Sequence, residues 1–372
     1  MTRVATIVTD ESQIPTPALI VDSNIVDRNL YRMAKYCAEH RLLLRPHAKT
    51  HKSQEMTRRQ IAHGAVGISV AKIGEAEALA DSAPGFFVAY PYVDGGKAAR
   101  IAELARHKSI MVAVDSALAI DVIATAAEIA EIEIGILVDL DVGFHRTGVK
   151  TAAESVELAR QIAKKPSLQL DGLFAFAGHV NGEPPDQIPQ LKQISSQLRE
   201  TIDAWKRDGH NPAIVSGGST PTAFNSHHVP EFTEIRPGNY IYNDSNGFRN
   251  DWCELEDCAA QVAVTVISNA VPGKCVIDAG SKTFSSDRLA LNQDKGGFGF
   301  IPEFPNAKIV RLSEEHGEVD LADCPQHPRL GQRLHVIPNH MCPCVNLQDW
   351  FWLKMADGRL ERMPVDARGR LS

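Results

Sequence analysis

Residues 110–140 read IMVAVDSALAIDVIATAAEIAEIEIGILVDL, and this stretch decides the fold class. It holds two apolar runs with the length of buried strands, Ile110–Val114 and Ile134–Leu140, and a helical pattern separates them. A strand, a helix and a second strand in this order are typical of a parallel sheet. The stretch therefore predicts an α/β fold.

The same alternation extends in both directions along the chain. Eight short apolar runs occur between residue 15 and about residue 230, and helical patterns separate them: Pro17–Val21, Leu42–Leu44, Ala65–Val70, Phe86–Tyr90, Ile110–Val114, Ile134–Leu140, Leu168–Phe174 and Ala213–Val215. Eight such units within about 200 residues favour closure into a (β/α)8 TIM barrel. An open, doubly wound sheet is the alternative. We expect the barrel over residues 15–250.

The composition changes after about residue 250. The runs CAAQVAVTVISNAV (258–271), GKCVIDAG (273–280) and DWFWLKM (349–355) look like strands joined by Gly, Pro and Asp turns. No pattern for a helix of three turns is evident there. The sequence therefore predicts a C-terminal β domain over residues 251–372, to which residues 1–14 could add a strand.

Charge and composition exclude several classes of protein. The 372 residues carry 39 Lys and Arg against 46 Asp and Glu, a net charge of −7. A mildly acidic chain without basic clusters argues against nucleic acids and membranes as partners. It has no apolar run long enough to span a bilayer and no signal-peptide pattern at its start. Seven scattered cysteines suit reduced thiols. We expect a cytoplasmic protein.

The first candidate site is RPHAKTHK, residues 45–52, at the end of the second predicted strand. In a barrel, residues at the carboxyl ends of strands line the active site. A lysine held there at low dielectric would favour its neutral amine, which condenses with aldehydes, and neighbouring cations would act in the same direction. Lys49 is therefore a candidate nucleophile. The alternative is a solvated basic loop.

Two further motifs follow the last predicted strand. Glycines and hydroxyls in Ser216–Thr222, with sequence SGGSTPT, could bring donors close to an anion, and late barrel loops often hold phosphate. In Glu234–Tyr240, Gly238 and Asn239 could add backbone donors, and Arg236 could bind a ring nitrogen or an acid. Alternatively, the glycine stretch is a turn, and Arg236 forms an ion pair that caps the barrel.

The fourth motif lies in the predicted β domain. In PNHMCPC, residues 338–344, an extended backbone would place His340 and Cys342 on the same side. Imidazole and thiolate are good ligands for zinc and similar divalent metals. Two protein ligands would leave coordination positions for substrate, which suits a catalytic metal. Cys344 would share that face only if the extension continued past Pro343, and a buried Cys/His pair without metal is the alternative.

Five segments together resemble one known family: RPHAKTHK, HRTGV (145–149), GGSTPT (217–222), RPGNYIYND (236–244) and PNHMC (338–342). They resemble the D-threonine aldolase and D-serine dehydratase group of fold-type III pyridoxal-phosphate enzymes, in the same order and over nearly the whole chain. The resemblance implies an alanine-racemase-like barrel, a C-terminal β domain and a homodimer. One segment departs from the group, because Phe176 stands where many members have the tyrosine of Tyr-x-Gly-His.

The resemblance also implies the roles of individual residues. Lys49 would carry pyridoxal 5'-phosphate as a Schiff base, and His340 and Cys342 would hold a divalent metal, with zinc expected and manganese, magnesium or cobalt as alternatives. His179 is a candidate catalytic, polar group of the active site, and a hydrogen-bonded core histidine is the alternative. The remaining residues implied to bind the cofactor are Arg146, Gly218, Ser219, Thr220, Arg236, Gly238, Asn239 and Tyr240.

These parts would serve two reactions of a D-configured β-hydroxy-α-amino acid. If the Cα–H bond breaks, Lys49 acts as base and the metal assists loss of the β-hydroxyl, which gives a keto acid and ammonia. If the Cα–Cβ bond breaks, the products are glycine and an aldehyde. The pair His-x-Cys and the segments GSTPT and PGNY resemble the dehydratases, so elimination on D-serine or 3-hydroxy-D-aspartate is favoured over the aldolase alternative.

Two other functions are less favoured. A racemase needs a second base, commonly a tyrosine from the β domain, and the sequence contains no tyrosine after Tyr242. A non-catalytic cofactor-binding protein would lack the β domain and the His-x-Cys pair.

Overall fold

The computed structural model describes residues 6–291 and 296–372, which form two compact units. We call them the barrel unit and the β unit. The barrel unit comprises Tyr31–Lys49, Gln54–Gly238 and Gly369–Ser372. The β unit comprises the described part of Met1–Leu30, Thr50–Ser53 and Asn239–Arg368. Helix α1 (Ser23–Glu39) begins in the β unit and ends in the barrel unit.

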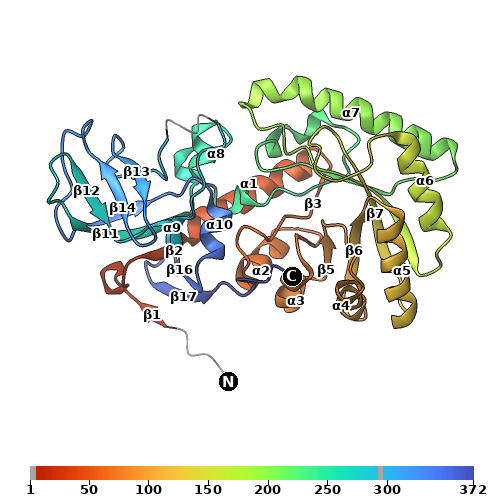
Figure 1. Cartoon of the computed structure of the whole chain (residues 1–372), viewed down its shortest axis with the longest axis horizontal. Coiled ribbons are helices and arrows are strands. Elements are labelled where there is room, and N and C mark those ends of the chain that lie inside the picture. The colour runs from red at the N-terminus through yellow and green to blue at the C-terminus, as the bar shows by residue number, and fades with distance from the viewer. Residues whose placement is uncertain (1–5, 292–295) are drawn as a thin grey trace. The chain divides into compact units, whose positions relative to one another are not determined.

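The barrel unit contains an eight-stranded parallel sheet (Figure 1). Its strands, in spatial order, are β3 (Leu43–Leu44), β10 (Glu234–Ile235), β9 (Ile214–Gly217), β8 (Leu168–Ala175), β7 (Ile134–Leu140), β6 (Ser109–Val114), β5 (Gly85–Val88) and β4 (Ile68–Val70). Backbone hydrogen bonds also join the two end strands: Val66 N–H donates to Leu44 O at 2.9 Å, and Ser69 N–H donates to Pro46 O at 2.8 Å. The sheet therefore closes, which confirms the predicted barrel.

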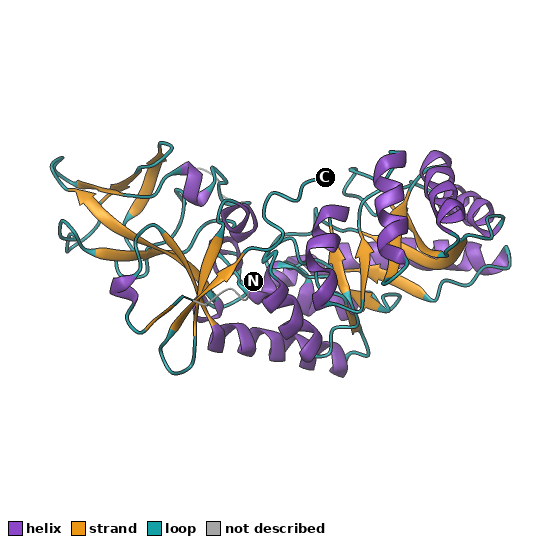
Figure 2. Cartoon of the chain, turned by 90° about the horizontal axis from the view of Figure 1, so that it is seen from below, coloured by secondary structure: helices purple, strands orange, loops and turns teal. Residues whose placement is uncertain are grey.

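Helices alternate with these strands and lie around them (Figure 2). They are α2 (Gln54–Ala62), α3 (Ile73–Leu79), η2 (Ala80–Ser82), α4 (Gly95–Ala105), α5 (Ala117–Ala130), α6 (Ala152–Ala163), α7 (Pro184–Arg207) and η3 (Ala223–His228). Side chains capping the first turn explain where α5 and α6 begin, since Ser116 and Thr151 accept hydrogen bonds from backbone N–H groups three residues later. Apolar side chains from β5 to β8 form a core cluster of Phe87, Met111, Ala113, Leu137 and Phe174.

The β unit is built on a mostly antiparallel sheet. Its strands run in the order β1 (Ile7–Val8), β17 (Leu360–Pro364), β16 (Trp350–Lys354), β2 (Ala18–Asp22), β11 (Ala260–Ser268), β12 (Lys274–Ile277), β14 (Gly317–Asp320) and β13 (Lys308–Leu312), and β15 (Arg333–Val336) also pairs with β11. Among the strand pairs of this sheet in the described residues, only the β2–β16 pair is parallel. Its helices are short: η1 (Glu11–Gln13), η4 (Asn239–Ile241), α8 (Ser245–Arg249), η5 (Leu255–Asp257), α9 (Ser281–Phe284) and α10 (Met341–Asn346).

One predicted barrel strand lies in the other sheet. The run Pro17–Val21 corresponds to β2, which pairs with β11 and β16 in the β unit. Its place in the barrel is taken by β10, which has only two residues, Glu234 and Ile235. The prediction was wrong here because an apolar run shows that a strand is buried but not which strands flank it. A two-residue strand that contains a glutamate gives no such run.

The helices give no sign of a membrane-spanning segment. Among the helices of residues 6–291 and 296–372, none combines the length and the apolar character that crossing a bilayer requires.

Candidate functional site

The segment RPHAKTHK leaves β3 at the seam where the barrel closes. His47 N–H donates to Pro237 O at 3.1 Å, and Ala48 N–H donates to Ser69 O at 2.9 Å. The buried His47 accepts a hydrogen bond at Nδ1 from the backbone N–H of Lys49, at 3.2 Å. The side chain of Lys49 is exposed, so the low-dielectric environment that the sequence predicts for its amine is wrong. The backbone at Lys49 is therefore fixed from both sides of the seam, while its amine stays accessible.

A buried network of polar side chains crosses the barrel next to this seam. Arg45 Nε donates to Glu234 Oε2 at 2.9 Å, and Ser216 Oγ donates to Glu234 Oε1 at 2.6 Å. Arg236 Nε in turn donates to Ser216 Oγ at 2.9 Å. Glu234 thus compensates the charge of Arg45.

Arg236 lies deep in the barrel, with 4% of its surface exposed. Its Nη2 donates to the carbonyl of Ala175 at 3.2 Å, and its guanidinium carbon is 4.2 Å from the ring centroid of Phe174. Burial lowers the pKa of Arg236 to about 10, a value at which it remains a cation at neutral pH. Among residues 6–291 and 296–372, Arg236 contacts a hydroxyl, a carbonyl and the rings of Phe87 and Phe174, and it forms no ion pair of the kind that would cap the barrel.

The two predicted phosphate-binding segments meet each other. Gly238 N–H donates to Thr220 Oγ1 at 3.2 Å, and Ser219 Oγ lies 3.0 Å from Thr222 Oγ1. Gly218 has a φ of 75°, and a Cβ added there would lie 3.1 Å from a side-chain carbon of β10. Only glycine suits that position without strain. The loop therefore gathers hydroxyls and backbone groups around a turn that glycine permits.

Arg146 lies against two aromatic rings. Its guanidinium carbon is 4.7 Å from the ring centroid of Phe176 and 5.0 Å from that of Phe144. Phe176 is the residue that departs from the family tyrosine, and it keeps an aromatic face toward the cation.

Asp139 is a functional candidate that the sequence analysis missed. It lies on β7 with 2% of its surface exposed, and its Oδ2 is buried without a hydrogen-bond partner. Burial raises the pKa of Asp139 to about 7, although a hydrogen bond from Thr147 and the charges of Arg236 and Arg146 act in the opposite direction. A carboxyl group at the carboxyl end of a barrel strand was a signal available in the sequence.

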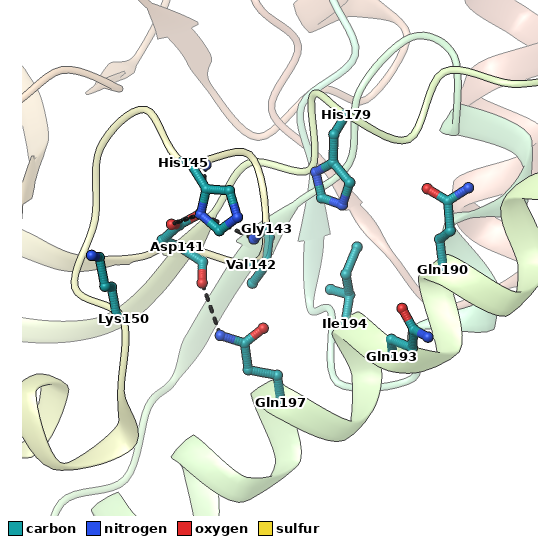
Figure 3. Close-up of a pocket in the computed structure, with 10 residues that line it drawn as sticks. All are labelled: Asp141, Val142, Gly143, His145, Lys150, His179, Gln190, Gln193, Ile194 and Gln197. Carbon is teal, nitrogen blue, oxygen red and sulfur yellow. Dashed lines mark hydrogen bonds and ion pairs between the residues drawn. The ribbon is translucent and has the colours of Figure 1, made fainter.

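His179 lines a cavity of about 280 Å³ between the loops after β7 and β8 and the helix α7 (Figure 3). Its Nδ1 is buried without a hydrogen-bond partner, and burial lowers its pKa, so the imidazole is neutral at pH 7. The predicted catalytic role of His179 stays a prediction.

In the β unit, His340 and Cys342 lie at the start of α10. His340 is extended and precedes the helix, whereas Cys342 belongs to its first turn. The predicted extended geometry is therefore wrong at Cys342, although the two side chains still hydrogen-bond to each other. Burial lowers the pKa of His340, but Cys342 and a hydrogen bond to Asp287 outweigh it and raise the pKa to about 11. Cys344 points elsewhere, since its thiol donates to Thr283 O at 3.2 Å.

Two residues support this pair: Asp287, which has no sequence signal, and Thr50, which lies in the segment RPHAKTHK. His340 Nδ1 lies 2.9 Å from Asp287 Oδ2, an arrangement that orients the other ring nitrogen of a metal-binding histidine. Thr50 Oγ1 lies 3.0 Å from Cys342 Sγ. Among the described residues, no group of three His, Cys, Asp or Glu side chains is arranged to hold a metal. The described metal candidates are therefore the pair alone.

Chain connectivity relates the two sets of candidates. Lys49 precedes Thr50 directly, so the candidate nucleophile is one residue from the hydroxyl that contacts Cys342. Gly238 likewise precedes Asn239, whose Nδ2 donates to Asp244 Oδ2 at 2.6 Å, and Tyr240 next to it is buried. The same Asp244 oxygen accepts a hydrogen bond from Met341 N–H, at 2.9 Å, between the two metal candidates.

Comparisons with known proteins agree on one family. Residues 21–246 match the family model described as "Alanine racemase, N-terminal domain", and residues 259–353 match "Putative serine dehydratase domain". A 3-hydroxy-D-aspartate aldolase of Paracoccus denitrificans (strain Pd 1222) is 31% identical, over 97% of this chain and 94% of its own. The chain belongs to the D-threonine aldolase and D-serine dehydratase family of alanine-racemase-like lyases.

Solved structures of this family have the same fold. The D-threonine aldolase of Filomicrobium marinum has a TM-score of 0.90 and 28% identity, covering 100% of this chain and 99% of its own. The D-threo-3-hydroxyaspartate dehydratase of Delftia sp. HT23 has a TM-score of 0.88 and 27% identity, covering 95% of this chain and 97% of its own. The family thus includes both aldolases and dehydratases, the two reactions that the sequence analysis weighed.

Proposed function

We propose that this lyase uses pyridoxal phosphate and a divalent metal to dehydrate D-configured β-hydroxy-α-amino acids. The observation that carries the proposal is the 3.0 Å contact between Thr50 Oγ1 and Cys342 Sγ within the β unit, because Thr50 directly follows Lys49 in the sequence. In this proposal the predicted barrel domain, residues 15–250, would hold the cofactor, and the predicted β domain, residues 251–372, would hold the metal.

The residues present fit a phosphate-bearing cofactor. Gly218 leaves room where a Cβ would be tight, and Ser219 and Thr220 supply hydroxyls beside Gly238. Lys49 offers an accessible amine on a fixed backbone. Further cofactor contacts are proposed for Arg146, Arg236, Asn239 and Tyr240. When bound, pyridoxal phosphate supplies an electron sink for the bond that breaks at Cα of the substrate.

The side chains of the protein would then have separate roles in the reaction. Lys49 removes the proton from Cα of the substrate once its amine is free. His340 and Cys342 supply the imidazole and thiol donors that zinc prefers, and a metal held there would assist departure of the β-hydroxyl. Asp287 fixes the imidazole of His340, and the side chain of Lys49 is exposed.

A specific observation favours a second candidate function. Two 3-hydroxy-D-aspartate aldolases and a D-threonine aldolase are 31%, 30% and 30% identical to the chain, slightly above the 28% of the D-threo-3-hydroxyaspartate dehydratase. The His-x-Cys pair favours dehydration instead. Product analysis with D-serine, D-threonine and 3-hydroxy-D-aspartate separates the two: ammonia with a keto acid supports dehydration, whereas glycine with an aldehyde overturns it in favour of aldol cleavage.

The cofactor assignment has its own test. We expect the purified protein to absorb visible light as bound pyridoxal phosphate does, and borohydride reduction followed by peptide mapping should place the cofactor on Lys49. The variant Lys49→Ala should lose the absorbance, while Lys97→Ala, a change on α4, should keep it. Cofactor attached to another lysine would contradict the assignment.

The metal is supported by a solved relative. A cysteine-to-alanine mutant of D-threo-3-hydroxyaspartate dehydratase was determined in the metal-free form, and it has a TM-score of 0.87 and 27% identity. We expect a chelator to abolish turnover without releasing the cofactor, and His340→Ala and Cys342→Ala to behave in the same way. Cys344→Ala, two residues further along α10, is the matched control and should stay active. Full turnover by metal-free protein would remove the metal from the proposal.

We further propose that the enzyme is a cytoplasmic homodimer that acts without nucleic acid or membrane partners. Sedimentation analysis of the loaded enzyme checks the oligomeric state, and a mass of one chain would refute it.

A further inference from the structure

The cavity beside His179 is not explained by the proposed function. Three parts of the barrel unit line it: the loop after β7, the loop after β8, and one face of α7 (Figure 3). Its lining residues are Asp141, Val142, Gly143, His145, Lys150, His179, Gln190, Gln193, Ile194 and Gln197. None of the residues proposed to hold the phosphate or the metal is among them.

The wall formed by the loop after β7 is held in a fixed shape. The carboxylate of Asp141 accepts hydrogen bonds from the N–H groups of Gly143 at 3.0 Å and His145 at 2.9 Å, and it lies 2.7 Å from His145 Nδ1. His145 has a φ of 56°, which is uncommon for a residue other than glycine. Such strain persists only where its surroundings impose it, and it is concentrated at functional sites.

Gly143 makes room for the imidazole on the opposite wall. It has a φ of 112°, and a Cβ added there would lie 3.1 Å from Cε1 and Nε2 of His179. Glycine therefore lets the backbone approach the ring edge closely. The backbone at Gly143 on one wall packs closely against the imidazole of His179 on the other. This close packing indicates a preformed site rather than a packing defect.

The face of α7 supplies amide groups. Gln190, Gln193 and Gln197 follow each other at helical spacing and so share one face. Gln197 Nε2 donates to the carbonyl of Asp141 at 2.8 Å, which fixes the third amide. The side chains of Gln190 and Gln193 make no hydrogen bond with the residues that the structure describes. Their amides are therefore available to a ligand as donors and acceptors.

The charges in the cavity select the class of ligand. Lys150 contributes an ammonium group, and the single carboxylate, Asp141, is already engaged by His145 and two backbone N–H groups. His179 is neutral because burial lowers its pKa. An anion therefore finds a cation and several donors, whereas a ligand ammonium group finds no uncommitted carboxylate among the lining residues. The volume of about 280 Å³ suits a small metabolite.

We propose that this cavity is a binding site for a small hydroxy or oxo carboxylate that lacks an ammonium group. The carboxylate of the ligand binds Lys150, and its oxygen substituent binds the amides of Gln190 and Gln193. The proposal rests on the cavity itself and holds whether the enzyme catalyses dehydration or aldol cleavage.

Two ligands of similar shape test the selectivity. Malate carries a hydroxyl where aspartate carries an ammonium group, so calorimetric titration of the cofactor-loaded enzyme with malate and with D-aspartate compares the two charges. We expect malate to bind at least tenfold more tightly to this site. Equal binding of both, or no binding of malate at millimolar concentration, overturns the proposal.

Three variants place the ligand. Lys150→Gln and Gln193→Ala should each weaken malate binding, the first by about tenfold or more because it removes a charge-assisted hydrogen bond. Lys192→Gln, an exposed change between two of the lining glutamines, is the matched control and should bind as the unaltered enzyme does. Unchanged thermal unfolding midpoints exclude misfolding as the cause of any loss. Binding that survives both lining variants, or malate that competes with pyridoxal phosphate, refutes the assignment.

Discussion

Asp139 is a buried carboxyl group whose charge is unfavourable in the folded chain. Because burial raises its pKa to about 7, the folded protein keeps a proton that the unfolded chain loses near pH 4. Stability from this group is therefore lost as the pH rises from about 4 to about 7. In the cofactor-free protein, Asp139→Asn should remove that loss, which amounts to at most about 4 kcal/mol. Urea unfolding at about pH 5 and about pH 8 measures it, and a pH dependence unchanged by the substitution would contradict the burial argument.

His335 behaves in the opposite way, because its partners stabilise the charged form. Hydrogen bonds to Glu11 and Glu303 raise its pKa to about 9, and their oxygens both lie 2.7 Å from the ring nitrogens. A raised histidine pKa contributes stability that is complete below about pH 6.5 and is lost as the pH rises through about 9. His335→Gln should therefore cost about 2–3 kcal/mol at pH 7 and little at pH 10. An equal cost at both values would show that charge is not the cause.

At the scale of single residues, contiguous motifs were visible in the sequence and their supporting partners were not. Lys49, Gly218 and His340 stand in segments whose residue types indicate their chemistry. Asp287 stands 53 positions before His340 and has no distinguishing neighbours, so only the fold brings the two together. Their contact depends on the path of the chain, which no local pattern encodes.

Helix α6 shows how a short segment sets the boundary of an element. Thr151 Oγ1 accepts a hydrogen bond from Glu154 N–H at 3.2 Å, and the carboxylate of Glu154 accepts one from Thr151 N–H at 3.0 Å. This reciprocal cap satisfies backbone groups that the first turn leaves open. Thr151→Ala should therefore lower the free energy of unfolding by about 1 kcal/mol. Thr125→Ala, an exposed change inside α5, is the control, and an equal loss there would argue against the cap.

At the scale of elements, the sequence predicted whether a segment is a strand or a helix better than it predicted which strands lie next to each other. The alternation of apolar runs and helices identified the parallel sheet, since burial on both faces leaves a clear apolar pattern. It assigned β2 to the wrong sheet and missed β10, because strand partners and very short strands leave no local signal. Likewise, α10 begins inside a segment that contains Pro343, which reads as extended although proline is tolerated in the first turn of a helix.

At the scale of the whole molecule, ligand binding should stabilise the fold if the proposed cofactor is correct. Pyridoxal phosphate at about one hundred times its dissociation constant should add about 2.7 kcal/mol to the stability of the cofactor-free chain, and this gain appears as a higher melting temperature. Pyridoxal, which lacks the phosphate, should add less if the loop at Gly218 binds the phosphate. Equal stabilisation by both compounds would contradict a role for that loop.

The pairing of β2 also bears on how the chain is made. Its partners β11 and β16 begin at Ala260 and Trp350, so the ribosome releases β2 long before either of them exists. Until then β2 is an apolar segment of the nascent polypeptide whose backbone N–H and C=O groups lack their strand partners. The barrel strands are synthesised during this time. We therefore expect chains arrested before Ala260 to aggregate or to be held by chaperones, even where all eight barrel strands have been translated.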